Sequence, residues 1–267
     1  MLAPAQCDRV DVVLASPRNP LNIGAAARAM ANFGFQHLSI VAPFAQNWME
    51  AKSAVGAPDL LREAKVFETL AEAVKDCTLV LGTGSLDRRR PEQAILTLPE
   101  AANRLRQHLT AQALQTGNPA KERVALLFGS EKHGLTSDDL SWCHALVVID
   151  TCEAQPSMNL GQAVAVCLYE ISRTPEIAPA PALPPADRID QIDQIKYPDS
   201  GQLDRLAGLI EQTMEAVNYS TRGMRSANGE ALRVLLRRLM PNEADLRRMM
   251  GLFRRILWQL GHRSDKL

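Results

Sequence analysis

The amino-acid sequence predicts an α/β protein with a parallel sheet, followed by a small all-α segment towards the C-terminus. Two observations predict the sheet: short apolar runs rich in Val, Leu and Ile alternate with helical patterns, and turn-forming or polar residues follow each run. A third predicts the all-α segment, because only helical patterns follow a proline-rich stretch after Ser172. With 267 residues, 46% of them apolar, the chain can bury a full core and a second, smaller one.

The elements of the first part follow from these patterns in order along the chain. Strands are predicted at Val10–Ala15, His37–Ala42, Lys65–Phe67, Thr78–Leu81, Val124–Phe128 and Ala145–Ile149. Helices are predicted from Ile23 through Met30, at Leu70–Asp76, Pro99–Gln115 and Met158–Glu170, with a partly helical excursion at Trp48–Arg62. Prolines end the first two strands, and Ser157 is predicted to be the N-cap of the last helix.

Prolines divide the chain into two parts. Five of them fall within eleven residues among several alanines (Pro175, Pro179, Pro181, Pro184 and Pro185), which predicts an extended linker. We therefore expect one domain at 1–172, a linker at 173–198 and a helical domain at 199–267. The three helices of this last part are expected at Gln202–Val217, Glu230–Leu239 and Glu243–Leu260.

Charge separates the two parts as well. The whole chain has a formal net charge of zero, with 30 basic and 30 acidic residues. From Asn218 to Leu267, however, ten arginines and one lysine stand against four acids, a surplus of seven positive charges. Such asymmetry predicts a polyanionic partner, with Arg237 and Arg238 as phosphate contacts, although a solvated helical face would give the same pattern.

Composition disfavours several classes of protein. The N-terminus lacks a basic start followed by an apolar core, and no apolar run approaches ~18 residues, so we expect a cytoplasmic protein with no membrane partner. The five cysteines show no CxxC pair and no Cys/His spacing typical of a metal site, which indicates buried free thiols. No metal is predicted.

Two loops that follow strands are the strongest candidates for a ligand site. Gly129–Leu135 follows one apolar run, and Asp150–Pro156 follows another and leads into Ser157-Met158-Asn159. Ligands bind outside the carboxyl ends of the strands in an open parallel sheet. We therefore expect Glu131 and these loops to form one pocket.

An alanine-rich helix carries two further candidates, Asn22 and Arg28. At a spacing of six residues they lie within roughly sixty degrees of each other around the helix axis, so both can lean over the same loop surface. Asn22 could equally serve only as an N-cap. The small residues of Gly24–Met30 let this helix approach the sheet, or another chain, closely.

A third loop follows the strand Thr78–Leu81 and begins with Gly82-Thr83-Gly84. Its glycine pair would suit a Rossmann-type nucleotide-dependent oxidoreductase, but the third glycine is missing, and arginines and a proline stand where a helix should begin. Arg88, Arg89 and Arg90 instead suggest contact with phosphate, with a solvated charge run as the alternative.

Three blocks of sequence occur in a characteristic order. They are Asn22-Ile23-Gly24-Ala25-Ala26-Ala27-Arg28, Leu127-Phe128-Gly129-Ser130-Glu131-Lys132-His133-Gly134-Leu135 and Ser157-Met158-Asn159-Leu160. Together they resemble the SPOUT superfamily of RNA 2′-O-ribose methyltransferases over residues 8–172. The C-terminal part, with Tyr197-Pro198 and Leu236-Arg237-Arg238-Leu239, resembles the helical extension of the TrmJ-type tRNA methyltransferases.

This resemblance implies a fold, a cofactor and a set of site residues. The fold is a parallel sheet with helices on both faces and a C-terminal trefoil knot, and the enzymes are homodimers that use S-adenosylmethionine. The residues that would line the cofactor pocket are Thr83, Gly84, Gly129, Ile149, Met158 and Leu160. The residues that match the family's functional positions are Asn22, Arg28, Glu131, Ser157 and Asn159.

The resemblance also implies a substrate, the 2′-hydroxyl of nucleotide 32 in the anticodon loop of tRNA. The chain departs from close relatives after Thr83, where Gly84-Ser85-Leu86 stands in place of Ser-Ala-Arg, so one of Arg88 to Arg90 would have to replace the missing arginine. A homodimer interface is expected to include Gly24–Met30. Methylation of ribosomal RNA or of another tRNA position, and a non-catalytic RNA-binding role, remain alternatives.

The implied chemistry asks little of side chains. A guanidinium stays charged at neutral pH, so we expect Arg28 to hold a phosphate and to stabilise a developing alkoxide rather than to accept a proton. The proton acceptor stays open at this point.

Overall fold

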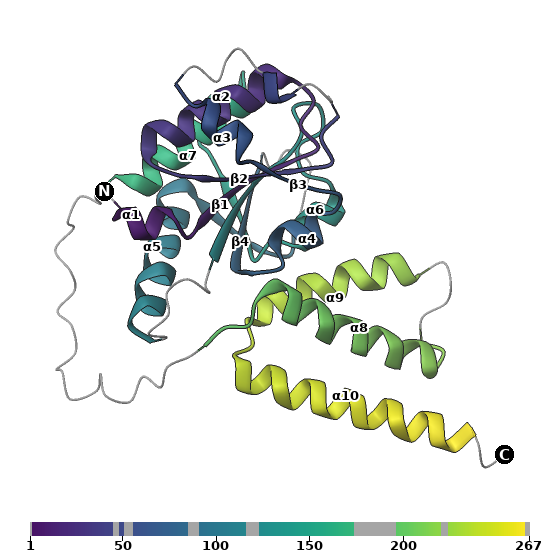
Figure 1. The fold of residues 1–267 in the computed structure, drawn as a ribbon. Helices are drawn as coiled ribbons and strands as arrows, with labels where there is room; N and C mark the ends of the chain where they lie inside the picture. The colour runs from purple at the N-terminus through teal and green to yellow at the C-terminus, as the bar shows by residue number, and fades with distance from the viewer. Residues whose placement is uncertain are drawn as a thin grey trace.

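One parallel sheet forms the centre of the protein (Figure 1). The computed structural model describes residues 2–44, 48–50, 56–84, 91–115, 123–173, 196–219 and 224–264. Within them, seven strands pair in the order β3-β2-β1-β6-β4-β7-β5, and all the pairs are parallel. The strands are β1 (Val10–Ala15), β2 (His37–Val41), β3 (Lys65–Phe67), β4 (Cys77–Thr83), β5 (Ala94–Thr97), β6 (Arg123–Phe128) and β7 (Ala145–Val148).

The strand predictions are confirmed to within two residues at every end, and one strand was missed. β5 lies at the edge of the sheet and is mostly exposed, with Ile95 47% accessible. Because only four residues pair and few of them are buried, the segment lacks the apolar run that marked the other strands.

Helices cover both faces of the sheet, as predicted. The helices of this part are α1 (Pro4–Cys7), α2 (Pro20–Phe33), α3 (Pro58–Arg62), α4 (Leu70–Val74), α5 (Leu98–Gln115), α6 (Ser137–Ser141) and α7 (Leu160–Ser172), with a 3-10 turn η1 at Trp48–Glu50. Alternate residues of β1 face opposite layers: Val12 and Leu14 pack with α2, α5 and α7, whereas Val13 and Ala15 pack with α4 and the α6 region. This alternation fixes the register of the sheet between two apolar layers.

The small residues of α2 serve its packing inside the chain. Gly24, Ala26 and Ala27 are buried, and α2 lies beside α7 (Figure 1). A Cβ atom on Gly161 of α7 would lie 2.6 Å from the Cβ of Ala25, so the two helices approach too closely for any larger residue. Of the two partners that the small residues allowed, the sheet layer and another chain, the first accounts for most of Gly24–Met30.

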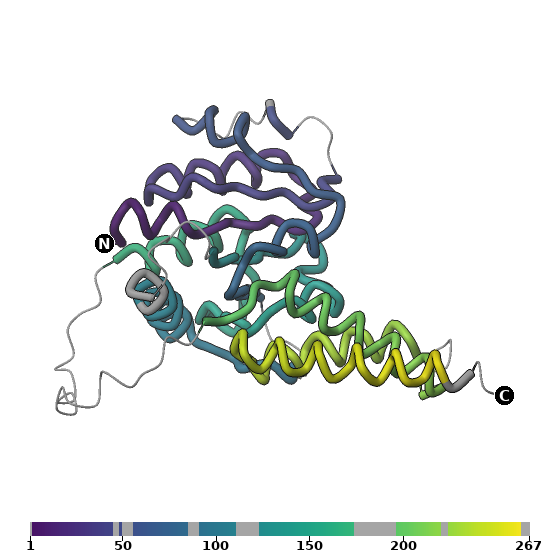
Figure 2. The backbone as a smooth tube through the Cα atoms, turned by 60° about the horizontal axis from the view of Figure 1, so that its bottom comes forward, coloured from purple at the N-terminus to yellow at the C-terminus, as the bar shows by residue number. Residues whose placement is uncertain are grey.

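Three further helices follow at the C-terminal end and are confirmed as helices. They are α8 (Ser200–Ala216), α9 (Arg225–Leu239) and α10 (Glu243–Ser264), and together they are called the helical tail below. Their small core consists of Leu203, Leu206, Ala207, Leu236 and Leu246. Both views show α8 beside α4 and the end of α10 pointing away from the sheet (Figures 1 and 2).

Cysteine burial agrees with the prediction at four positions and not at the fifth. Cys7, Cys77, Cys143 and Cys167 are buried free thiols, and burial raises the pKa of both Cys143 and Cys167 to about 12. Cys152 is exposed, because the loop after β7 that carries it has no apolar layer above it.

The described residues include neither a helix that could span a membrane nor a cluster of side chains suited to a metal ion. None of the helices in that part of the chain is both long enough and apolar enough to cross a membrane. The same part holds no group of three His, Cys, Asp or Glu side chains with the geometry of a metal site.

Candidate active site

A cavity of about 730 Å³ opens at the carboxyl ends of β4, β6 and β7. It is lined by Thr83 and Gly84 after β4, by Phe128 through Leu135 after β6, and by Val148–Thr151, Glu153, Pro156–Met158, Leu160 and Ala163 after β7. This volume is in the range of small-molecule and cofactor sites. All six residues predicted to line a cofactor pocket line this cavity: Thr83, Gly84, Gly129, Ile149, Met158 and Leu160.

Hydrogen bonds join the three sequence blocks beside this cavity. Asn22 Nδ2 donates to Glu131 Oε1 at 2.9 Å, and Asn159 Nδ2 donates to Asn22 Oδ1 at 2.8 Å. These three residues are here called the amide–carboxylate network, and Asn22 lies more than a hundred residues of sequence from each of the other two. Asn22 and Asn159 do not line the cavity themselves, so their side chains hold its walls in place.

Glu131 closes the loop after β6 onto the start of α2. Its carboxylate also accepts hydrogen bonds from the backbone N–H of Arg18 at 2.9 Å and of Asn19 at 3.0 Å. Desolvation alone would raise the pKa of Glu131, but the hydrogen bonds from Asn22 and from backbone N–H groups outweigh it, and the pKa lies below its usual value. An ionised carboxylate with these partners is a poor proton acceptor and a good anchor.

The start of α7 is capped two residues later than predicted. Asn159, not Ser157, is the N-cap, and its Oδ1 accepts from Gly161 N at 2.9 Å and from Gln162 N at 3.4 Å. Both residues suit an N-cap position, so sequence alone could not choose between them. Ser157 remains exposed and lines the cavity.

Three glycines shape the cavity: Gly129 and Gly134 allow a tight turn, and Gly84 leaves space beside the wall. A Cβ on Gly129 would lie 2.1 Å from the carbonyl carbon of Gly134 and 2.2 Å from the nitrogen of Leu135. Gly134 has a φ of +65°, which favours glycine, and its N–H donates to Ser130 O at 2.8 Å. Among the described residues, no atom lies within 4 Å of the Cβ position on Gly84, whereas the neighbouring Thr83 hydroxyl donates inward to Leu127 O at 3.0 Å.

Arg28 lies apart from this cavity. Its side chain is exposed on α2, six residues after Asn22, and it is not among the residues that line the cavity. Asn22 is not an N-cap either, because Asn19 caps α2 by accepting from Leu21 N at 2.9 Å. Asn22 therefore contacts the cavity wall through Glu131, whereas Arg28 does not line the pocket of its own chain.

The predicted RNA-binding arginines have different outcomes. Arg237 as a phosphate contact is wrong: its side chain is 1% exposed, its Cζ lies 4.8 Å from the ring centroid of Trp142, and burial lowers its pKa to about 10. Arg238 is exposed and pairs with Glu92 at 2.6 Å. Arg88, Arg89 and Arg90 lie outside the described residues.

The loop Asp150–Pro156 lies at the cavity as predicted, but two carboxylates in it were not singled out from the sequence. Asp150 and Glu153 line the cavity from the loop after β7. Asp150 is the first residue after the predicted strand Ala145–Ile149, so its place at the carboxyl end of a strand was the signal.

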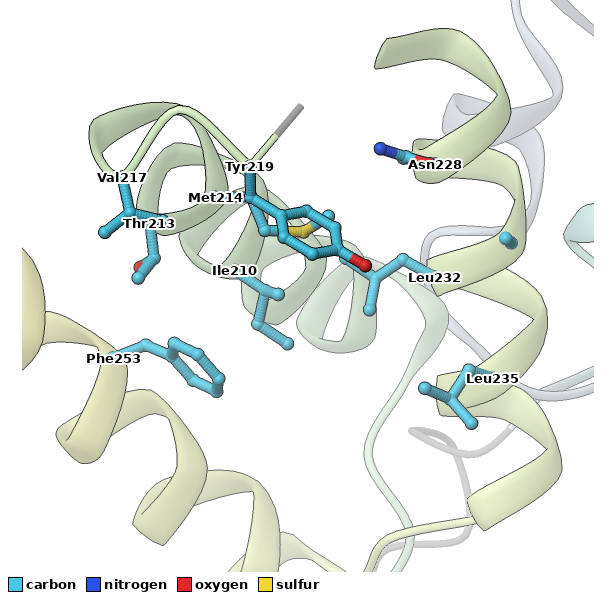
Figure 3. Close-up of a pocket in the computed structure, with 10 residues that line it drawn as sticks. Ile210, Thr213, Met214, Val217, Tyr219, Asn228, Leu232, Leu235 and Phe253 are labelled. Carbon is cyan, nitrogen blue, oxygen red and sulfur yellow. The ribbon is translucent and has the colours of Figure 1, made fainter. Parts of the chain in front are cut away.

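A second cavity, of about 470 Å³, lies in the helical tail (Figure 3). Figure 3 shows Ile210, Met214, Leu232, Leu235 and Phe253 turned towards it from three helices, with Tyr219 above them. None of the ten described residues that line it is charged. It therefore offers no counter-ion to a charged cofactor, and the first cavity is the candidate active site.

The fold and this site define an open-sheet α/β protein that binds a small molecule at the carboxyl ends of its strands. Residues 9–169 match the family model described as "SpoU rRNA Methylase family". This match covers more than half of the chain, so the protein belongs to that family of methyltransferases.

Individual relatives are similar in sequence. A TrmJ tRNA (cytidine/uridine/adenosine-2′-O-)-methyltransferase of Pseudomonas aeruginosa is 41% identical over 165 residues, which cover 61% of this chain and 60% of the relative. A tRNA (cytidine/uridine-2′-O-)-methyltransferase TrmJ of Salmonella choleraesuis is 30% identical over 251 residues, or 91% of this chain and 94% of the relative.

Solved structures agree with the fold. TrmJ from Z. mobilis superposes with a TM-score of 0.74 at 27% identity, covering 92% of this chain and 98% of that one. A probable methyltransferase from Bordetella pertussis gives a TM-score of 0.56 at 30% identity, covering 64% of this chain and 98% of that one.

Proposed function

We propose that this protein is an S-adenosylmethionine-dependent methyltransferase that modifies ribose 2′-hydroxyl groups of tRNA, at position 32 of the anticodon loop. The observation that carries the proposal is the amide–carboxylate network, which joins all three resemblance blocks around one cavity. Family membership and the tRNA methyltransferase names of the relatives support the same reaction. Such work on tRNA also agrees with the cytoplasmic location expected from the sequence.

The residues of the cavity fit the cofactor. Phe128, Leu135, Val148 and Ile149 give an apolar wall for an adenine ring, and the open position beside Gly84 leaves room at its edge. Asp150 and Glu153 offer negative charge to the sulfonium and ammonium groups. When bound, S-adenosylmethionine supplies an electrophilic methyl group, which the chain itself cannot provide.

The side chains divide the remaining work. Glu131 and Asn159 hold the loop after β6 and the start of α7, so the cavity keeps its shape without further ordering. Glu131 is a poor candidate for the proton acceptor, because protonation would cost the hydrogen bonds that it accepts from Arg18, Asn19 and Asn22. We assign the 2′-hydroxyl proton to water, with Ser157 at the cavity wall to orient it.

We further propose a homodimer that meets through the outer surface of α2 and α7. Leu21 is 54% exposed on α2, and Tyr169 is 56% exposed on the neighbouring α7. The catalytic role predicted for Arg28 depends on this dimer, since Arg28 does not line the pocket of its own chain. Sedimentation at micromolar concentration tests it: a species of only 29.3 kDa would contradict the proposal.

The proposed division of labour follows the predicted domains. Residues 1–172 would carry the chemistry and form the trefoil knot, 173–198 would link, and 199–267 would bind tRNA. Exposed arginines on α10 (Arg247, Arg248, Arg254 and Arg255) replace Arg237 as candidate phosphate contacts. Single-molecule pulling on 1–172 tests the knot, because a knotted chain stays shorter than its full contour length when unfolded.

Mass spectrometry of nucleosides tests the activity. The protein is incubated with methyl-labelled S-adenosylmethionine and with total tRNA or ribosomal RNA in separate reactions. We expect label in 2′-O-methylcytidine or 2′-O-methyluridine from tRNA, located at nucleotide 32 after digestion. Label only in ribosomal RNA would move the substrate, and label in neither RNA would leave a binding protein.

Arg28→Ala separates docking from chemistry in the same assay. We expect the single-turnover rate at saturating tRNA to fall by roughly a hundredfold, as when one preorganised donor is lost from an active site. Binding of the cofactor should survive because Arg28 lies outside the cavity, and tRNA binding should survive within several-fold because the exposed arginines of α10 remain. A normal rate at saturating tRNA would reduce Arg28 to a docking residue.

A further inference from the structure

The helical tail contacts the sheet at the amino ends of the strands, on the side opposite to the candidate active site. This side of the sheet is called the docking edge below. Gly201 N donates to Lys75 O at 2.9 Å, Arg238 pairs with Glu92 at 2.6 Å, and α9 packs against Trp142. Each of the three contacted residues stands just before a strand, β4, β5 or β7 respectively. The cavity lies at the carboxyl ends of β4 and β7, and the seven residues of β4 at ~3.3 Å each separate the two sites by about 20 Å.

Arg233 makes the most contacts at this docking edge. Its Nε donates to Ser141 Oγ at 2.9 Å, its Nη2 pairs with Asp138, and its Cζ lies 5.0 Å from the ring centroid of Trp142. Its side chain is only 18% exposed. Arg237 stacks on the same ring, so Trp142 lies in contact with two guanidinium groups.

Packing continues from this ring to the wall of the cavity. Trp142 is followed by Cys143, and a Cβ on Gly82 would lie 2.5 Å from Cys143 Sγ and 3.1 Å from Leu135 Cδ1. Gly82 is directly followed by Thr83 and Gly84 of the cavity, and Leu135 lines it from the other side. A shift of α6 would therefore be transmitted to the cavity wall, because each residue along this path is in close contact with the next.

We propose that Arg233 is a positioning residue, which locks the helical tail at a fixed distance and angle from the methyl-transfer pocket. The proposal rests on the proposed function, because it assumes that the tail holds tRNA while the pocket acts on one ribose. The tail has its own small core of Leu203, Leu206, Ala207, Leu236 and Leu246, so loss of Arg233 leaves its helices folded. What is lost is the angle between them and the sheet.

A charge swap tests this assignment. Arg233→Asp and Asp138→Arg each place like charges together, and the double variant restores an opposite pair without changing the net charge. We expect each single variant to lower the single-turnover rate at saturating tRNA by roughly tenfold or more, since a small misplacement far from the reacting atoms has such effects. The double variant should recover most of this loss.

Two other measurements distinguish positioning from docking or folding. The affinity for tRNA should stay within about threefold, because the tail remains covalently attached and its exposed arginines are intact. The radius of gyration from X-ray scattering should rise in the single variants and return in the double. A matched control is Arg62→Asp, which breaks an exposed pair with Asp59 on α3, outside the docking edge; its rate should equal that of the unaltered protein.

Some outcomes would overturn the proposal. Single variants with a normal rate, or a double variant as slow as the singles, would show that the Arg233–Asp138 pair does not set the geometry. Weaker tRNA binding with a normal rate would make Arg233 a phosphate contact. Failure of the proposed function looks different, because the unaltered protein would then methylate no tRNA, while the scattering result would still report on how Arg233 holds the helical tail against the sheet.

Discussion

The carboxyl and amino ends of the parallel strands form two edges of the sheet, and different interactions stabilise them. At the carboxyl edge, amides and one carboxylate bond to each other and to backbone N–H groups, around a cavity whose loops are largely exposed. At the amino edge, Arg233 and Arg237 hold the helical tail against Trp142, and Arg237 is fully buried. The carboxyl edge therefore depends on directional hydrogen bonds, whereas the amino edge depends on packing that joins two parts of the chain.

The comparison shows that the type of a residue does not indicate at which of these two edges it acts. The motif residues Asn22, Glu131 and Asn159 resembled catalytic groups, yet the hydrogen bonds they make are to each other and to backbone N–H groups. The arginines of α9 resembled a nucleic-acid surface, yet two of them face the sheet. Substitutions at each edge can test how far the difference extends.

The largest effect is expected at the buried end of the docking edge. Arg237→Ala should lower the free energy of unfolding by about 3 kcal/mol, because it leaves a cavity beside Trp142. Arg237→Met fills the same space without a buried charge and should be neutral or stabilising. Denaturant melts of both variants check this. Equal destabilisation by the two would mean that the charge itself, rather than packing, secures the tail.

Gly129→Ala should have the next largest effect, at the carboxyl edge. The added Cβ meets backbone atoms of Gly134 and Leu135, which cannot rotate away, so the loop must shift at a cost of about 2 kcal/mol. Cofactor titration by calorimetry should show weaker binding as well. Gly84→Ala is the control for stability, since its Cβ position is open, and it should melt with the unaltered protein.

Asn159→Ala should have a smaller effect on stability. It removes the N-cap of α7 and the bond to Asn22, and loss of such a cap costs about 1 kcal/mol. Ser157→Ala, two residues earlier, removes no cap, and its melting midpoint should stay unchanged. If the serine variant were the less stable one, the cap observed at Asn159 would not operate in solution.

The smallest effect is expected at Glu131, and it should disappear in acid. The pKa of Glu131 lies below its usual value in the folded chain, so its hydrogen bonds add stability above the unfolded pKa of about 4.3. This contribution is lost as pH falls through the lower, folded pKa. The unfolding free energy of Glu131→Gln should therefore approach that of the unaltered protein at low pH. A constant difference between the two at all pH values would contradict the assignment.

The fold was largely predictable because its signals are local. Short apolar runs rich in Val, Leu and Ile marked six of the seven strands of the described sheet, while β5 was missed because an exposed edge strand needs no such run. The cavity was predictable too, since its loops follow strands directly. The start of α7 was misjudged by two residues, because Ser157 and Asn159 suit a cap equally well.

The roles of individual side chains were harder to predict. Whether Arg237 or Arg238 faces solvent depends on where α9 docks, and α9 docks through residues such as Trp142 that lie about a hundred positions earlier. The same holds for Arg28, whose helix packs its small residues inward and leaves the arginine outside. Such long-range contacts leave no periodic trace in the sequence.

The hydrogen bonds of Glu131 determine which of the two loops that form the cavity wall can move. Moving the loop after β6 would strip the start of α2 of its carboxylate and break bonds to Arg18, Asn19 and Asn22. The hydrogen bonds seen within the loop after β7, from Thr151 to Pro156 and from Gln155 to Cys152, stay inside that loop and can travel with it. When a ligand enters or leaves this cavity, the loop after β7 can therefore move more easily than the loop after β6, which stays anchored to α2.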